Sequence, residues 1–238
     1  MQISEAVRSL ESDLKLIFAE RLRSLIAYGD AGGTNHSPTP TLAVIDDLTI
    51  DDLRACADRI RAWQDAGLST PLILRTEEFG RSLDVFPYEF GAILADHAVV
   101  WGQNPFAGLR VDPSDLRRAC EIQVRGHLLH LRQGFIETRG RSDALAELIT
   151  RSLPPLIALL KSVARLHGAQ RADALAAAAI VERAIGISSE STASFSEIIM
   201  LSSKGPLSSD AARRLYPEYL DTLERLTIHI DRWTYDAR

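Results

Sequence analysis

The chain has few of the residues that mark several common classes of enzyme. Its 238 residues include two cysteines, Cys56 and Cys120, neither of them in a recognisable motif. Both lie in helical patterns, so we expect buried free thiols in a reducing compartment, by default the cytoplasm. The sequence also contains no Gly-x-Gly-x-x-Gly and no Gly-x-Ser-x-Gly. These absences exclude the dinucleotide-binding fingerprint and the nucleophile elbow of serine hydrolases.

Long apolar runs and an excess of positive charge are absent as well. No apolar segment approaches the ~20 residues that span a bilayer, and the first residues lack the basic and apolar regions of a signal peptide. The formal net charge is −5, with 27 basic and 32 acidic residues. The sequence therefore predicts no membrane association and argues against nucleic acid as a partner.

The first part of the chain alternates between helical and strand patterns. Hydrophobic spacing from Val7 to Phe18 predicts a helix, and Thr49 with the acidic residues after it predicts the start of another. Short apolar runs predict strands at residues 24–28, 41–45, 71–75, 83–86 and 98–101. This order predicts a small α/β domain, with a mixed sheet and flanking helices, over residues 1–105.

Beyond a segment with Pro and Gly at residues 103–108, nearly the whole chain has helical patterns. Helices are predicted at residues 113–138, at 142–167 with a kink or break at Pro154 and Pro155, and at 172–185, 193–201 and 208–233. We therefore predict an all-α helical bundle as a second domain over residues 106–238.

The segment at residues 22–47 resembles the start of a nucleotidyltransferase domain. In that family the first strand ends in Gly-Ser, and the second strand carries an Asp-x-Asp pair that binds metal. Here Gly29 is followed by Asp30, and the Asp-x-Asp positions fall on Pro38 and Pro40. The two-part layout is similar to that of small bacterial nucleotidyltransferases, including antibiotic-modifying ones. It also resembles a group of nucleotidyltransferase-like proteins with segments similar to residues 82–90, 101–106 and 125–133.

These departures remove groups that nucleotidyl transfer needs. Carboxylates hold the divalent metal that neutralises triphosphate charge, and proline offers neither a charge nor a backbone donor. Pro38 and Pro40 also predict that this end of the strand is a sheet edge or lies outside the sheet. Asp30 would repel a triphosphate, so we interpret it as a turn residue. Asp46 and Asp47 are adjacent and would face opposite sides of a strand, and Asp47 equally suits the start of the next helix.

Asp84 remains as a candidate carboxylate. It lies between apolar residues of the strand expected at residues 83–86. Burial of a charge among apolar residues is costly unless the charge is paired or serves a function. The resemblance implies that Asp84 is the third metal-site carboxylate or the general base. The alternative is a strand-face aspartate paired with Arg75 or Arg81.

Arg125 and His130 have the Arg-x4-His spacing of the ribonuclease motif in HEPN helical domains. The same predicted helix is rich in basic side chains, so a solvated basic face that meets an acidic partner or a phosphate is the competing interpretation. Its members are Arg117, Arg118, Arg125, His127, His130, Arg132 and Arg139. No convincing third metal ligand accompanies His127 and His130, and no metal site is predicted.

The sequence leads to one main hypothesis and two alternatives. We expect a catalytically degenerate nucleotidyltransferase-fold protein that binds a nucleotide, another small ligand or a protein partner, with self-association also open. Candidate ligand-binding residues are Gly29, Asp30, Asp46, Asp47, Arg125 and His130. The first alternative is an active nucleotidyltransferase that uses Asp84, non-standard carboxylates and Mg²⁺; otherwise no cofactor is expected. The second is a helical-domain ribonuclease or toxin-like module.

Overall fold

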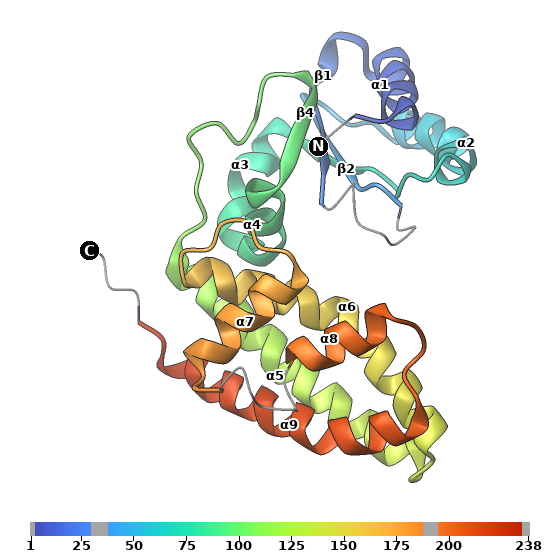
Figure 1. Ribbon diagram of the computed structural model, residues 1–238. Coiled ribbons are helices and arrows are strands. Elements are labelled where there is room, and N and C mark those ends of the chain that lie inside the picture. The colour runs from blue at the N-terminus through green and yellow to red at the C-terminus, as the bar shows by residue number, and fades with distance from the viewer. Residues whose placement is uncertain (1–2, 30–37, 188–194, 235–238) are drawn as a thin grey trace. The chain divides into compact units, whose positions relative to one another are not determined.

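The chain folds into two compact units. The computed structural model describes residues 3–29, 38–187 and 195–234. The units are Met1–Val111 and Asp112–Arg238 (Figure 1). Phe106 belongs to the first unit, because it is buried and its ring centroid lies 5.1 Å from that of Phe79. This packing carries the first unit past residue 105, where the sequence placed its end.

The first unit contains a mixed sheet. Its strands are β1 Leu22–Tyr28, β2 Thr41–Ile45, β3 Leu72–Arg75 and β4 His97–Gly102. In the described part of the chain they lie in the order β3-β2-β1-β4, with β2 and β3 parallel and the other pairs antiparallel. The helices are α1 Glu5–Phe18, the short 3-10 helix η1 Ala19–Arg21, α2 Ile50–Asp65, α3 Thr76–Val85 and α4 Pro87–Ala95.

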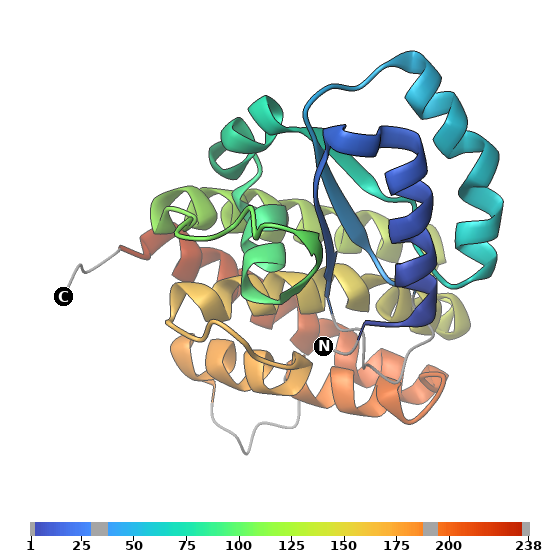
Figure 2. The same ribbon diagram turned by 90° about the horizontal axis from the view of Figure 1, so that it is seen from above.

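Alternate residues of the two central strands face two separate apolar cores. Leu25 and Ala43 pack with α1 and α2, whereas Ile26 and Leu42 pack with α3 and α4. Figure 2 shows α1 and α2 on one side of the sheet and α3 and α4 on the other. Successive strand side chains point to opposite faces, and here both faces are covered. Every residue of β2 is therefore buried, which explains the uninterrupted apolar run in the sequence.

The prediction of a strand at residues 83–86 is wrong. Leu83, Asp84 and Val85 form the last turn of α3, and Phe86 joins α3 to α4. The helix buries Phe79 on one side and leaves Asp84 exposed on another. A short apolar run does not by itself distinguish a strand from a helix. The local signals for helices were the acidic first turn of α3 and the proline at the first position of α4.

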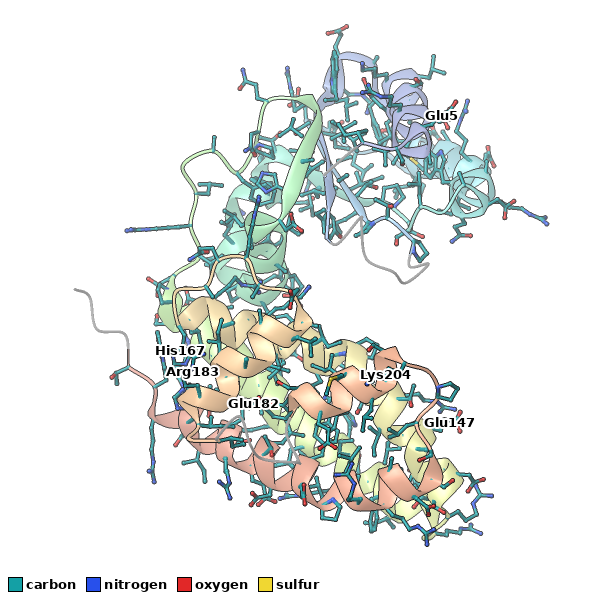
Figure 3. The ribbon with its side chains drawn as sticks, in the orientation of Figure 1. Glu5, Glu147, His167, Glu182, Arg183 and Lys204 are labelled. Atoms are coloured by element: carbon teal, nitrogen blue, oxygen red, sulfur yellow. The ribbon has the colours of Figure 1, made fainter. Side chains whose placement is uncertain are left out.

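The second unit consists of helices and their connecting turns, with no strand among its described residues. Its helices are α5 Pro113–Thr138, α6 Ser142–Leu166, α7 Ala174–Ala184, α8 Phe195–Ser203 and α9 Ser209–Arg232 (Figure 1). The three long helices α5, α6 and α9 pack against one another, and α7 packs against α6 and α8. Buried Glu182 of α7, labelled in Figure 3, accepts hydrogen bonds from Ser196 N–H and Oγ, both at 2.8 Å. This carboxylate ties α7 to the first turn of α8.

α6 continues through Pro154 and Pro155, so the alternative of a break at these prolines is wrong, and the alternative of a kink stays a prediction. Leu153 and Leu156 are buried on either side of the prolines, so tertiary packing keeps the apolar face continuous despite the lost backbone donors.

Cys56 and Cys120 are buried free thiols, as predicted, and burial raises the pKa of both. Within the described ranges, no helix has the length and apolar character to cross a membrane.

Candidate functional site

Strand directions bring four chain segments to one end of the sheet. β1 is antiparallel to β2 and to β4, and β3 is parallel to β2. The end of β1 at Gly29 therefore lies beside the segments that lead into the other strands, at residues 38–40, 68–69 and 96–97. We call this end of the sheet the Gly29 edge. The nucleotidyltransferase resemblance places the metal-binding aspartates here.

Main-chain hydrogen bonds hold the proline segment between its two neighbours. On one side Thr39 N–H donates to Gly67 O at 2.8 Å, and Ser69 N–H donates to Thr39 O at 3.0 Å. On the other side Tyr28 N–H donates to Pro40 O at 3.1 Å. The segment precedes β2 and so lies outside the strand, as one of the two predicted alternatives had it, whereas the other alternative is wrong because β2 is a central strand of the sheet. The prolines are tolerated because Thr39 supplies the donor and Pro40 serves as an acceptor.

Gly29 turns the chain at the end of β1. Its φ of 76° lies in the region that favours glycine, and its N–H donates to Asp96 O at 3.1 Å. A Cβ added at Gly29 would lie 3.5 Å from Pro40 Cγ, so Gly29 and the proline segment are in van der Waals range. Asp30 lies outside the described residues, and its role as a turn residue or a ligand stays a prediction.

Asp96 and His97 reach the Gly29 edge, and sequence reasoning missed both. Half-buried Asp96 follows α4, and its main chain binds Gly29. The His97 ring nitrogens face two oxygen atoms, Ile93 O at 3.0 Å from Nδ1 and Asn104 Oδ1 at 3.2 Å from Nε2. Their position just before a predicted strand was visible in the sequence. The pairing of β4 with β1 could not be read from the sequence, because strand order depends on long-range contacts.

Asp46 and Asp47 lie at the opposite end of the sheet from Gly29. Arg23 Nε lies 2.7 Å from both carboxylate oxygens of Asp46, and this hydrogen bonding lowers the pKa of Asp46. Asp47 O accepts a hydrogen bond from Arg21 Nη1 at 3.2 Å. The extended chain from Pro40 to Asp46 spans about 20 Å at the rise of a β-strand. Magnesium–oxygen bonds are roughly 2 Å long, so these aspartates cannot share a metal with the Gly29 edge.

Asp84 stands on the exposed side of α3 and does not face the sheet from a strand. The alternative pairing with Arg75 is also wrong, because Arg75 Nη2 binds Glu78 Oε1 at 2.7 Å. Among the described residues, no group of three or more His, Cys, Asp or Glu side chains is arranged to hold a metal ion.

The basic face predicted on α5 is largely paired with acidic side chains. Arg125 Nη2 lies 2.9 Å from Glu121 Oε1 and 3.3 Å from Asp231 Oδ1. Arg132 Nη2 lies 2.7 Å from Glu224 Oε1 on α9. Similar pairs join Arg117 to Glu121 and Arg118 to Asp115. Carboxylates of α5 and α9 therefore offset much of the charge of this face, whose Arg125 and Arg132 side chains remain exposed, and its binding of an acidic partner or a phosphate stays a prediction. His130 is exposed beside it.

His127 faces the interior of the helical unit rather than His130. Its Nε2 lies 2.6 Å from the hydroxyl of buried Tyr219, which in turn lies 3.1 Å from Ser152 Oγ. Burial, with a smaller effect of His130, lowers the pKa of His127 to about 4. The imidazole is therefore neutral near pH 7 and serves as a buried hydrogen-bonding group.

The sequence matches no protein-family model, and no curated protein is detectably similar to it. Among solved structures, the chain is similar to the spectinomycin adenyltransferase AAD(9) from Enterococcus faecialis, crystallised with ATP and spectinomycin. The TM-score is 0.55 at 12% sequence identity, and the match covers 96% of this chain and 99% of that one. This likeness confirms the predicted fold class, a nucleotidyltransferase-like sheet domain followed by a helical domain.

Proposed function

We propose that this chain is a nucleotidyltransferase-fold protein that has lost nucleotidyl transfer. In this proposal it acts by binding a nucleotide, another small ligand or a protein partner at the Gly29 edge. The observation that carries the proposal is the chemistry of that edge, where Pro38 and Pro40 stand at the positions that the resemblance assigns to the metal-binding aspartates. The adenyltransferase that shares the fold was crystallised with ATP, which makes ATP the first ligand to test.

The charge distribution of the first unit supports the same conclusion. Nucleotidyl transfer needs carboxylates that hold divalent metal against the triphosphate. Asp46 is engaged by Arg23 at the far end of the sheet, and Asp84 lies on the outside of α3. Asp96, whose main chain reaches the Gly29 edge, is the one acidic residue in the described segments there, and a two-metal centre needs carboxylates from more than one residue. Half-buried Tyr28, whose pKa is raised by burial, adds a neutral phenol there.

We predict that Mg²⁺ does not strengthen the binding of ATP to this protein. The physical reason is that Pro38 and Pro40 offer no carboxylate at the positions where the resemblance places the ligands of a bridging metal. Isothermal calorimetry with ATP, with and without Mg²⁺, measures this directly. Micromolar binding that requires Mg²⁺ and disappears in Asp84→Asn or Asp96→Asn would instead support the active nucleotidyltransferase.

A repaired chain provides the positive control. Asp30→Ser, Pro38→Asp and Pro40→Asp together restore the family's ligands, so this variant should gain Mg²⁺-dependent ATP binding if only the ligands were lost. A triple variant that folds normally and still binds no metal would show that Pro38 and Pro40 are not the equivalent positions.

A further inference from the structure

Two histidine side chains of the helical unit lie close together, with a ring nitrogen of one facing a ring nitrogen of the other. His167 follows the last residue of α6, and His229 lies in the last turn of α9. Their Nε2 atoms are 3.0 Å apart, whereas the ring centroids are 5.2 Å apart and the ring planes are inclined by 26°. The two rings therefore approach each other through their nitrogens. His167, which Figure 3 labels, is exposed, and His229 is partly exposed.

Both imidazoles are suited to act as neutral ligands. Burial lowers the pKa of both, and His229 further lowers that of His167. At 3.0 Å a single proton lies between the two Nε2 atoms, so one ring donates and the other accepts. If that proton moves to Nδ1 of its own ring, both Nε2 lone pairs become available and neither ring changes charge.

We infer that His167 and His229 form a binding site for a divalent transition-metal ion. Two nitrogens bound to one ion at ~2.0 Å lie about 2.8 Å apart in a square-planar site and about 3.3 Å apart in a tetrahedral one. The observed 3.0 Å falls between these values, and a tilt of roughly 35–45° of each of the two rings, which now face each other almost end to end, would direct both lone pairs at one ion.

The backbone at the pair favours a cation, although the same last turns also carry the basic side chains of Arg165 and Arg232. Both histidines lie at C-terminal ends of long helices, where the helix dipole carries partial negative charge. Arg165 donates to Ser162 Oγ at 2.7 Å, and Arg225 binds Asp221 at 2.8 Å, so these neighbouring cations are engaged by other groups.

The composition of the site indicates which ions it takes. Imidazole suits Cu²⁺, Zn²⁺ and Ni²⁺, and the general affinity order places Cu²⁺ first. No third His, Cys, Asp or Glu completes the group within the described residues, so water or an external ligand would fill the remaining positions. The ion would link the ends of α6 and α9.

Titration of the full chain with CuCl₂ and ZnCl₂ at pH 7.5, followed by calorimetry, tests this inference. We expect one equivalent of Cu²⁺ to bind, with at least tenfold weaker binding in His167→Gln and in His229→Gln. The matched control is His130→Gln, which removes another exposed imidazole of the same unit and should keep the wild-type affinity. The metal should also raise the unfolding temperature of the wild type, but not that of either site variant.

The electron paramagnetic resonance spectrum of the Cu²⁺-loaded wild type gives a test that needs no variant. It should show coupling of the copper to two imidazole nitrogens. Coupling to fewer than two, no measurable binding, or binding that survives both site substitutions would each overturn the inference. A loss of binding in His130→Gln, with both site variants unaffected, would instead place the metal on α5.

Discussion

Replacing Gly102 with alanine is expected to destabilise the first unit by about 3 kcal/mol. The residue ends β4 with a φ of 73°, a conformation that costs an L-residue roughly 1–2 kcal/mol. A Cβ at this position would lie 2.0 Å from Arg23 O and 3.2 Å from Ser24 Cα, and overpacking of this kind costs roughly 1–3 kcal/mol. The clash is with the backbone of β1, so relief requires that the strands separate.

Urea unfolding and hydrogen–deuterium exchange of the full chain measure this effect. Amides of β1 and β4 should exchange faster in Gly102→Ala, because the pairing of Ser24 with Gly102 is disturbed. Gly80→Ala is the matched control within the same unit. Gly80 lies inside α3 with no atom within 4 Å of an added Cβ, so alanine there should stabilise by about 0.5–1 kcal/mol. Equal losses in both variants would contradict the close approach of β4 to β1.

Replacing Asp52 with alanine is expected to cost about 2–3 kcal/mol at pH 7. The buried carboxylate receives hydrogen bonds from Arg21 Nη1 and Nη2, both at 2.7 Å, and from Thr49 N–H at 2.9 Å. It therefore closes the capping box of α2 and joins that helix to the chain before β1. Loss of a cap costs roughly 0.5–2 kcal/mol, and loss of one partner of a buried ion pair costs more.

The same residue predicts how stability depends on pH. Hydrogen bonding from Arg21, with a further contribution from Thr49, holds the pKa of Asp52 well below its usual range. A carboxyl with a depressed folded-state pKa stabilises the fold fully above its unfolded pKa of ~3.9, and this contribution disappears as the pH falls towards the folded value. The difference in unfolding free energy between wild type and Asp52→Ala should therefore be constant from pH 7 to about 5 and shrink below pH ~4.

Exposed Asp51 provides the control for Asp52. Its side chain pairs with Arg54 within the first turn of α2, at the surface. Asp51→Ala should change the unfolding free energy by less than about 0.5 kcal/mol at pH 7. A difference between wild type and Asp52→Ala that stayed constant down to pH 2 would contradict the assigned ionisation of Asp52.

The positions of helices and strands were largely readable from local patterns. Thr49 and the acidic residues after it mark the start of α2, and Pro113 marks the first residue of α5. β2 was visible because every one of its side chains is buried. The error at Asp84 has the same origin, because an apolar run of that length suits a strand or a helix until its packing is known. No local pattern related Pro38 and Pro40 to metal-binding aspartates. That assignment came from the resemblance to nucleotidyltransferases.

The sequence by itself determined the class of fold, because hydrophobic spacing and capping residues act over a few neighbouring positions. The tertiary structure alone decided which polar groups meet. The pairing of β4 with β1 places Asp96 and His97 beside Gly29. Asp46 follows β2 and lies at the other end of the sheet. The tertiary structure also brought His167 to His229, across 62 residues of chain. Such meetings follow from strand order and helix packing, which depend on the burial of whole apolar faces rather than on local spacing.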